Sequence, residues 1–309
     1  MQNYQHSGAI PPIGALLTML ISFSAAAVMG VCYTMLFYYI PFIYLNFLLT
    51  LGFGTILGLI VGGFARSGKI RNTTFVTLLG FLAACVGLYF AWGTTFFGIV
   101  EMGKLPETVV NLNIKAYDPM MIIALAQHLF ENGSWALRGG GNVTGWFLVA
   151  FWLVEAGMIF YFTLTNARDS ITKDIFCEQC YEWIPTEIAQ VLQGDKNDPA
   201  WEQIRMGMLA PLADMERYTG GDSFIKLSVS CCPNCSTTQY FSAHACQTKV
   251  DKDGDTSTSE TPIIVHQQLT STDVELVRNA GREPVVAQPD EAADGDGDDG
   301  ADGLPNIVT

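Results

Sequence analysis

Long apolar runs alternate with short polar segments in the first half of the chain. A bilayer core of about 30 Å requires roughly 20 apolar residues in a helix. Four runs reach this length: 12–37, 42–64, 73–97 and 145–165. None contains lysine or arginine, and none shows the polar face expected of a soluble helix. The pattern therefore predicts a bundle of four transmembrane helices within residues 1–168.

The polar segments between the runs predict the orientation of this bundle. Positive residues favour the cytoplasmic side of a membrane. The link between the second and third runs holds three of them, Arg66, Lys69 and Arg71. Arg168 and Lys173 follow the fourth run. We therefore expect both termini to be cytoplasmic and the long loop 98–144 to face outward.

A short helix is expected inside this outer loop. Asp118 is suited to cap a helix that begins at Pro119 and continues through residues 120–130. It is too short to span a bilayer and is expected to lie in the interface or fold back on the bundle. His128 within it has the character of a surface residue rather than a metal ligand.

Three glycines at spacing four, Gly54, Gly58 and Gly62, lie in the second run. They share one face of a helix and allow a neighbouring backbone to approach closely. One hypothesis is that this face joins copies of the chain into a homo-oligomer. The other is that it packs against the chain's own first or third helix.

Glu155 is a carboxyl within the fourth run. An ionisable group at that depth is costly and is a candidate functional residue. It could relay protons or bind a cation. It could also be a protonated carboxyl hydrogen-bonded to a neighbouring helix, since the four runs hold no second charged residue to pair with it.

Eight cysteines divide into two groups. Cys32 and Cys85 stand alone in the apolar runs, where cysteine acts as a small apolar residue. Six follow the fourth run, and four of these form two C-x-x-C pairs: Cys177 with Cys180, and Cys232 with Cys235. Two such pairs complete a tetrahedral four-thiolate metal site. The spacing therefore predicts structural Zn²⁺ held by these four residues.

Several alternatives to this site stay open. In a cytoplasmic domain, thiols are kept reduced, which favours a metal over disulfides. A thioredoxin-like redox pair and an iron site with the same ligands are both compatible with the spacing. Cys231 is an alternative ligand to Cys232. Cys246 and His244 are left over, and with Cys231 could be solvent-exposed.

Residues 169–246 surround the cysteine pairs, and their local pattern resembles a zinc ribbon. Residues 224–230 alternate as a strand leading into the second pair, and 237–241 could return beside it. The long stretch between the pairs departs from a compact ribbon, with 185–192 and 199–217 expected to be helical. The expectation is a cytoplasmic ribbon with a helical insertion.

The whole arrangement resembles uncharacterised bacterial multi-pass inner-membrane proteins with a C-terminal zinc-ribbon-like domain. The resemblance lies in Gly133-Ser-Trp135 through Gly145, in Trp152-Leu-Val-Glu155, and in Cys177-Glu-Gln-Cys-Tyr-Glu-Trp183. It implies a cell-membrane location and this architecture, but no activity.

Residues 247–309 form an acidic tail. The chain has a net charge of −14, and from Lys249 onward 14 Asp and Glu stand against four Lys and Arg. This composition predicts disorder and argues against nucleic acid as a partner. The acidic runs at 251–255 and 294–298 lack the glycine and glutamate of a calcium loop. One helix is expected at 273–280, with a capping box from Thr270.

The predicted fold class is thus a four-transmembrane-helix bundle, all-α in the membrane, followed by a small zinc-ribbon-like α+β domain and a disordered acidic tail. No nucleotide loop, nucleophile elbow or zinc-protease helix occurs in the sequence. The favoured function is a membrane-anchored binding or scaffold protein that presents the zinc domain to a cytoplasmic protein partner. The alternative is a small oligomeric transporter or channel with Glu155 in the membrane path.

Overall fold

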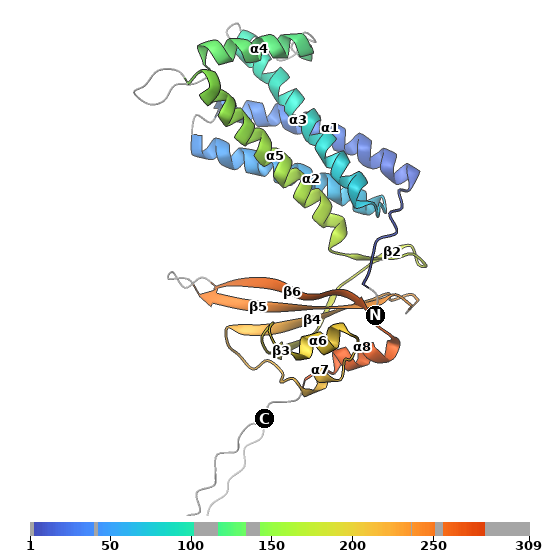
Figure 1. Ribbon diagram of the computed structural model, residues 1–309. Coiled ribbons are helices and arrows are strands. Elements are labelled where there is room, and N and C mark those ends of the chain that lie inside the picture. Colours follow the sequence, from blue (N-terminus) through green and yellow to red (C-terminus); the bar gives the residue numbers. More distant parts are fainter. Residues whose placement is uncertain are drawn as a thin grey trace, which may run out of the picture.

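The computed structural model describes residues 3–39, 43–101, 117–133, 143–235, 237–250 and 256–281. A helical bundle occupies one end of the molecule, and a sheet domain occupies the other (Figure 1). The bundle contains α1 (Pro12–Tyr39), α2 (Ile43–Ser67), α3 (Thr73–Glu101) and α5 (Gly145–Thr172). Each is long and apolar enough to cross a membrane. Four helices of the expected length and apolar character are therefore present, and α5 continues beyond the expected end at residue 165.

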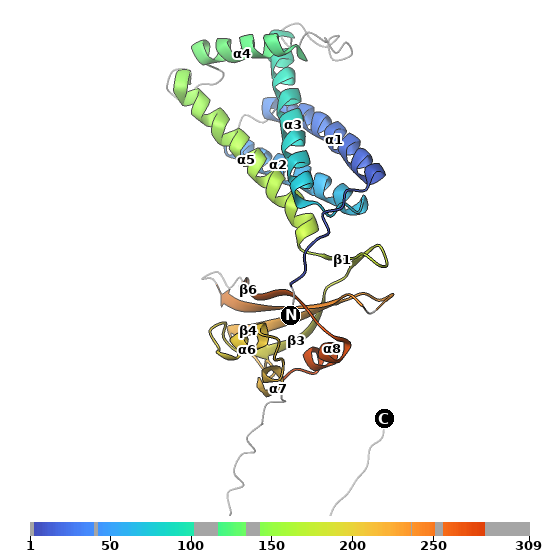
Figure 2. The same cartoon turned by 45° about the vertical axis from the view of Figure 1, so that its right-hand side comes forward.

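The short helix α4 (Pro119–Asn132) lies across the end of the bundle that is farthest from the sheet domain, as both views show (Figures 1 and 2). Asp118 caps it by accepting a hydrogen bond from the Met120 backbone N–H at 2.9 Å. Leu125 and Leu129 on its inner face pack with Leu148 of α5. The predicted cap and the folding of this helix back onto the bundle are therefore both confirmed.

The glycine face of α2 packs against α5. The Thr163 hydroxyl donates to the Gly54 carbonyl oxygen at 3.1 Å. A Cβ atom added at Gly58 would lie 2.7 Å from the Thr163 carbonyl oxygen, and one added at Gly62 would overlap the Ser170 hydroxyl. The expected partner, the first or third helix, was wrong. Because α5 covers this face within one chain, it is not free to join a second copy.

The sheet domain begins with a small hairpin of β1 (Ile175–Cys177) and β2 (Glu182–Ile184). A four-stranded antiparallel sheet follows, in the order β3 (Glu187–Gln193), β4 (Ser223–Cys231), β5 (Gln239–Val250) and β6 (Thr256–Gln268). Three short helices cover the sheet on the side away from the bundle (Figures 1 and 2): α6 (Ala200–Arg205), α7 (Pro211–Asp214) and α8 (Ser271–Arg278). The hairpin lies between the bundle and this sheet.

The helical insertion was predicted wrongly in its first part. Residues 187–193 form β3 and pair with β4, from Glu187 opposite Val229 to Gln193 opposite Phe224. A short apolar run is ambiguous between helix and strand, and the available sheet edge decides it here. In the second part, only 200–205 and 211–214 of the expected helix 199–217 are helical, and Trp201 and Ile204 of the first of these helices enter the domain core. The strand expected at 224–230 is present as β4, and the expected return strand is the first part of β5.

The domain was expected to end at residue 246. It extends further, because the segment 256–281 belongs to it. β6 pairs with β5 along most of its length. Its first half is polar, so hydrophobicity alone predicted disorder, but the edge of β5 satisfies its backbone. The helix and capping box expected near Thr270 are confirmed, with Asp273 closing the box. The acidic runs at 251–255 and 294–298 lie outside the described residues.

Candidate metal centre

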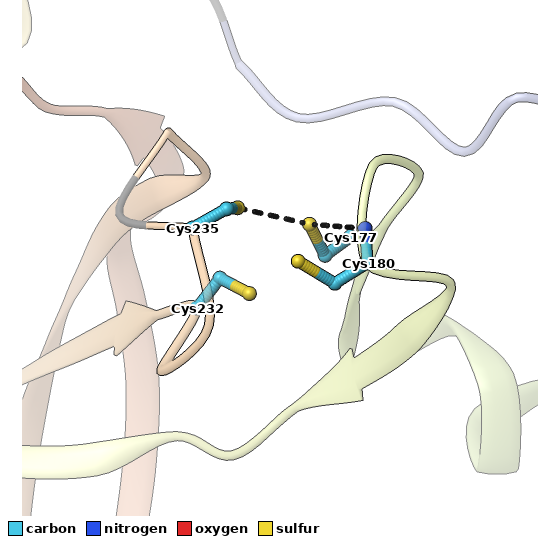
Figure 3. Close-up of side chains that lie close together, drawn as sticks. All are labelled: Cys177, Cys180, Cys232 and Cys235. Carbon is cyan, nitrogen blue, oxygen red and sulfur yellow. Dashed lines mark hydrogen bonds between the residues drawn. The ribbon is translucent and has the colours of Figure 1, made fainter.

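The four cysteines of the two C-x-x-C pairs come together from two different sheets. Cys177 ends β1, and Cys180 lies in the turn toward β2, where its backbone N–H donates to the Cys177 sulfur at 3.4 Å. Cys232 directly follows β4, and Cys235 lies in the next turn. Figure 3 shows the two pairs facing each other across a small gap. We call the turn from Cys177 to Cys180 the first knuckle and that from Cys232 to Cys235 the second.

The sulfur positions fit a tetrahedral metal ion. All four Sγ atoms lie within 4.8 Å of one another, and the Cys177 and Cys235 sulfurs are 3.5 Å apart. A disulfide would require about 2.05 Å, so these are free thiols. Four sulfurs at about 2.3 Å from a central zinc are separated by about 3.8 Å in tetrahedral geometry. The predicted ligand set is therefore assembled, and it suits a soft divalent metal.

The remaining cysteines of the domain do not join this cluster. Cys231 lies in β4 opposite Gln239 and is half-buried, so it is not brought to the cluster as an alternative ligand. Cys246 is buried in β5 opposite Phe224. The expectation of a solvent-exposed thiol was wrong for Cys246, because β5 continues past the expected strand end. Cys32 and Cys85 are exposed on the outer surface of the bundle.

Polar neighbours bias the protonation of the sulfurs. Hydrogen bonding to Thr237, through its hydroxyl and its backbone, lowers the pKa of Cys235 to about 6. Hydrogen bonding to Cys235 raises the pKa of Cys180, and burial raises the pKa of Cys232. The Thr238 hydroxyl donates to the Cys177 sulfur at 3.3 Å. Donors aimed at sulfur are the outer contacts that favour thiolate ligands.

The first knuckle is held against the loop between α2 and α3. The Lys69 ammonium donates to the Tyr181 carbonyl oxygen at 2.7 Å and lies 4.5 Å from the centre of the Tyr181 ring. Arg71, only 4% exposed, pairs with Glu178 at 3.0 Å. Its guanidinium lies 4.3 Å from the centre of the Phe176 ring. Cations over aromatic faces are attracted by the ring quadrupole, so this loop binds the knuckle directly.

Arg66 extends the same contact toward β2. It pairs with Asp174 and lies 5.3 Å from the centre of the Trp183 ring. The Trp183 indole N–H donates to the Arg66 carbonyl oxygen at 2.9 Å. The positive residues that predicted the orientation thus also attach the hairpin to the bundle. Sequence reasoning missed this role, although the aromatic residues around the first knuckle were a usable signal.

The segment before α1 forms a second connection to the sheet domain. The Tyr4 backbone N–H donates to the His266 carbonyl oxygen at 2.9 Å. The Phe176 backbone N–H donates to the Tyr4 hydroxyl at 3.0 Å, and the Tyr4 and Tyr240 rings pack edge to face. Tyr4 therefore borders the cysteine cluster from the N-terminal side. No pattern in the first residues predicted this contact.

Glu155 lies on the buried side of α5, four residues before the buried Ile159. The Tyr33 hydroxyl of α1 donates to its Oε1 atom and also contacts the hydroxyl of Thr50 on α2 at 3.0 Å. The carboxyl is therefore hydrogen-bonded to a neighbouring helix, as one of the sequence-based hypotheses expected. Glu155 lies 17 residues before the end of α5, about 25 Å along the helix, and the cysteine cluster lies beyond that end, so the two sites are separate.

Comparison of the chain with protein-family models, curated proteins and solved structures finds no match. The resemblance noted from the sequence therefore stays a hypothesis, and function is argued from the geometry alone.

Proposed function

We propose that this chain is a membrane-anchored binding or scaffold protein, whose polar domain is built on a structural zinc site. The observation that supports it best is the cluster of Cys177, Cys180, Cys232 and Cys235, with all four sulfurs within 4.8 Å. Four protein sulfurs fill every position of a tetrahedral ion, which leaves no site for substrate or water. Such a centre contributes folding energy rather than chemistry.

The place of the cluster in the fold supports a joining role. The first knuckle belongs to the hairpin attached to Lys69 and Arg71 of the bundle. The second knuckle follows β4 of the larger sheet. An ion bound by both would link the two parts and hold the sheet domain close to the membrane surface. A domain fixed in this way is suited to present its outer face to a protein partner.

The orientation is part of the proposal. The α2–α3 loop, the segment before α1 and the sheet domain all lie at one end of the bundle (Figures 1 and 2). Arg66 at the end of α2, with Lys69 and Arg71 in this loop, favours the cytoplasmic side, where thiols stay reduced. We therefore propose a cell membrane, by resemblance the bacterial inner membrane, with both termini cytoplasmic. Iron could occupy the same four thiolates, and zinc is proposed because a closed site of this kind needs no redox activity.

Metal analysis of the full chain in detergent tests this proposal. The wild type is expected to retain about one zinc per chain. Cys177→Ser is expected to lose the metal and unfold the sheet domain, whereas the control Cys231→Ser, outside the cluster, should keep both. Retained iron would replace zinc in the proposal. A protein without metal that shows a reversible dithiol–disulfide couple would refute the structural role.

The second candidate is the small oligomeric transporter with Glu155 in the membrane path. The hydrogen bond from Tyr33 favours a role for this carboxyl inside the bundle. The test compares the flux of protons or cations across vesicles containing the wild type with the flux across vesicles containing Glu155→Gln. Equal flux in the two proteins would remove this candidate and leave the scaffold proposal intact.

A further inference from the structure

Three helices contribute polar groups to one small network in the bundle. Glu155 lies ten residues from the start of α5, about 15 Å along the helix. Tyr33 of α1 and Thr50 of α2 are buried, with 7% and 4% of their surfaces exposed. The Tyr33 hydroxyl contacts both Glu155 and Thr50. The Thr50 hydroxyl in turn lies 3.0 Å from the backbone carbonyl oxygen of Asn46.

Counting hydrogens shows what this network needs. It contains three close oxygen–oxygen contacts: Glu155 to Tyr33, Tyr33 to Thr50, and Thr50 to the Asn46 carbonyl. The two hydroxyls supply only two hydrogens, and a carbonyl and an ionised carboxylate supply none. One contact would therefore join two oxygens with no hydrogen between them, which is unfavourable in an apolar interior. A proton on Glu155 supplies the missing hydrogen.

We propose that Glu155 is a proton-binding site of the bundle, completed by Tyr33 and Thr50. The Tyr33 hydroxyl donates to an ionised Glu155, and in the protonated state this bond reverses, so that the carboxyl O–H donates to the Tyr33 oxygen. Tyr33 donates to Thr50, and Thr50 donates to the Asn46 carbonyl. Every hydrogen then has an acceptor, and the chain of bonds joins α5, α1 and α2. Loss of the proton removes one link and leaves a charge without a positive partner.

The surroundings agree with a neutral site. No lysine, arginine or second carboxylate lies within the four apolar runs. Two other polar side chains of the bundle have partners other than Glu155. Tyr89 of α3 donates to the Tyr117 carbonyl, and the exposed His128 of α4 contacts Asn132. A metal cation is less suited than a proton, because hard cations require about six oxygen ligands, and the network offers fewer. The buried Asn46 side-chain oxygen, one turn from Thr50, has no hydrogen-bond partner among the described residues.

Infrared spectroscopy of the full chain in lipid at neutral pH tests the proposal. A protonated carboxyl gives a C=O band distinct from that of a carboxylate, and solvent-exposed carboxyls are ionised at this pH. The expected result is a protonated-acid band that is absent in Glu155→Gln. Tyr33→Phe should shift the band to higher frequency, because it removes the acceptor. The matched control Tyr39→Phe, 76% exposed on the same helix, should not shift it.

A measurement on the wild type covers the case in which Glu155→Gln fails to fold. Incorporation of glutamate labelled with ¹³C at the side-chain carboxyl should move the same band to lower frequency. A labelled wild type without any protonated-acid band at neutral pH would overturn the proposal. So would a band that sodium ions remove at constant pH, since the site would then be a cation site. Both outcomes leave the metal-centre proposal untouched.

Discussion

The packing of α2 against α5 can be tested with two alanine substitutions in one helix. Gly58 and Gly63 both lie within α2. A Cβ added at Gly58 would lie 2.7 Å from the Thr163 carbonyl oxygen and 2.8 Å from Asn166 Cβ. A Cβ added at Gly63 would meet no atom within 4 Å. The pair therefore separates the effect of close packing from the effect of replacing glycine by alanine.

The expected magnitudes follow from two opposing terms. Replacing glycine by alanine within a helix gains up to about 1 kcal/mol, and this gain applies to both variants. Overlap with a fixed backbone oxygen forces the helices apart at a cost of about 1–3 kcal/mol, and it applies only at Gly58. We expect Gly63→Ala to be neutral or stabilising. Gly58→Ala should be less stable than Gly63→Ala by about 1–3 kcal/mol.

Unfolding of the purified protein in mixed micelles, followed by circular dichroism, measures this difference. Size-exclusion chromatography with light scattering reports the oligomer on the same samples. Packing within one chain predicts an unchanged oligomeric mass for both variants. Equal stability of the two variants, within about 0.5 kcal/mol, would refute the close contact. A change of mass in Gly58→Ala alone would show that the glycine face joins two copies.

Three further predictions concern the sheet domain. Arg71→Met should destabilise docking of the first knuckle by about 1–2 kcal/mol, as measured by thermal unfolding. The control Arg168→Met, at an exposed position, should leave the unfolding temperature unchanged. Burial lowers the pKa of His266 from 6.5, so the unfolded chain binds more protons and stability falls as pH drops below about 6.5. Asparagine tolerates the φ of 48° at this position, so His266→Asn should reduce the loss of stability at low pH, as measured by denaturant titrations. An unchanged dependence of stability on pH would exclude His266 as the source of the loss. Thr270→Ala breaks the capping box and should cost about 1 kcal/mol in the same titrations; no loss would mean that α8 is held by packing alone.

The sequence alone was sufficient to predict a feature wherever that feature depends only on residues close together in the chain. Twenty apolar residues must span a bilayer as a helix because only a helix satisfies its own backbone there, and the four long helices follow. The C-x-x-C spacing brings two sulfurs to one point, so Cys177 and Cys180 could be named as candidate metal ligands. Asp118 and Thr270 could be identified as caps because a cap depends on residues within one turn.

Sequence patterns failed where distant partners decided the outcome. Residues 187–193 became a strand because the edge of β4 was available. The polar first half of β6 became ordered because β5 offered a row of backbone partners. Both cases show tertiary pairing overriding local propensity.

What the sequence determined by itself is the list of parts: four membrane-length helices, two C-x-x-C cysteine pairs and one carboxyl within an apolar run. The tertiary structure decided what each part touches. It placed α5 on the glycine face, Arg71 on the first knuckle, Tyr4 beside the cluster and Tyr33 on Glu155. The physical reason is that a local pattern fixes backbone conformation and burial, whereas the partner of a buried polar or charged group depends on which segments the whole fold brings within hydrogen-bonding distance.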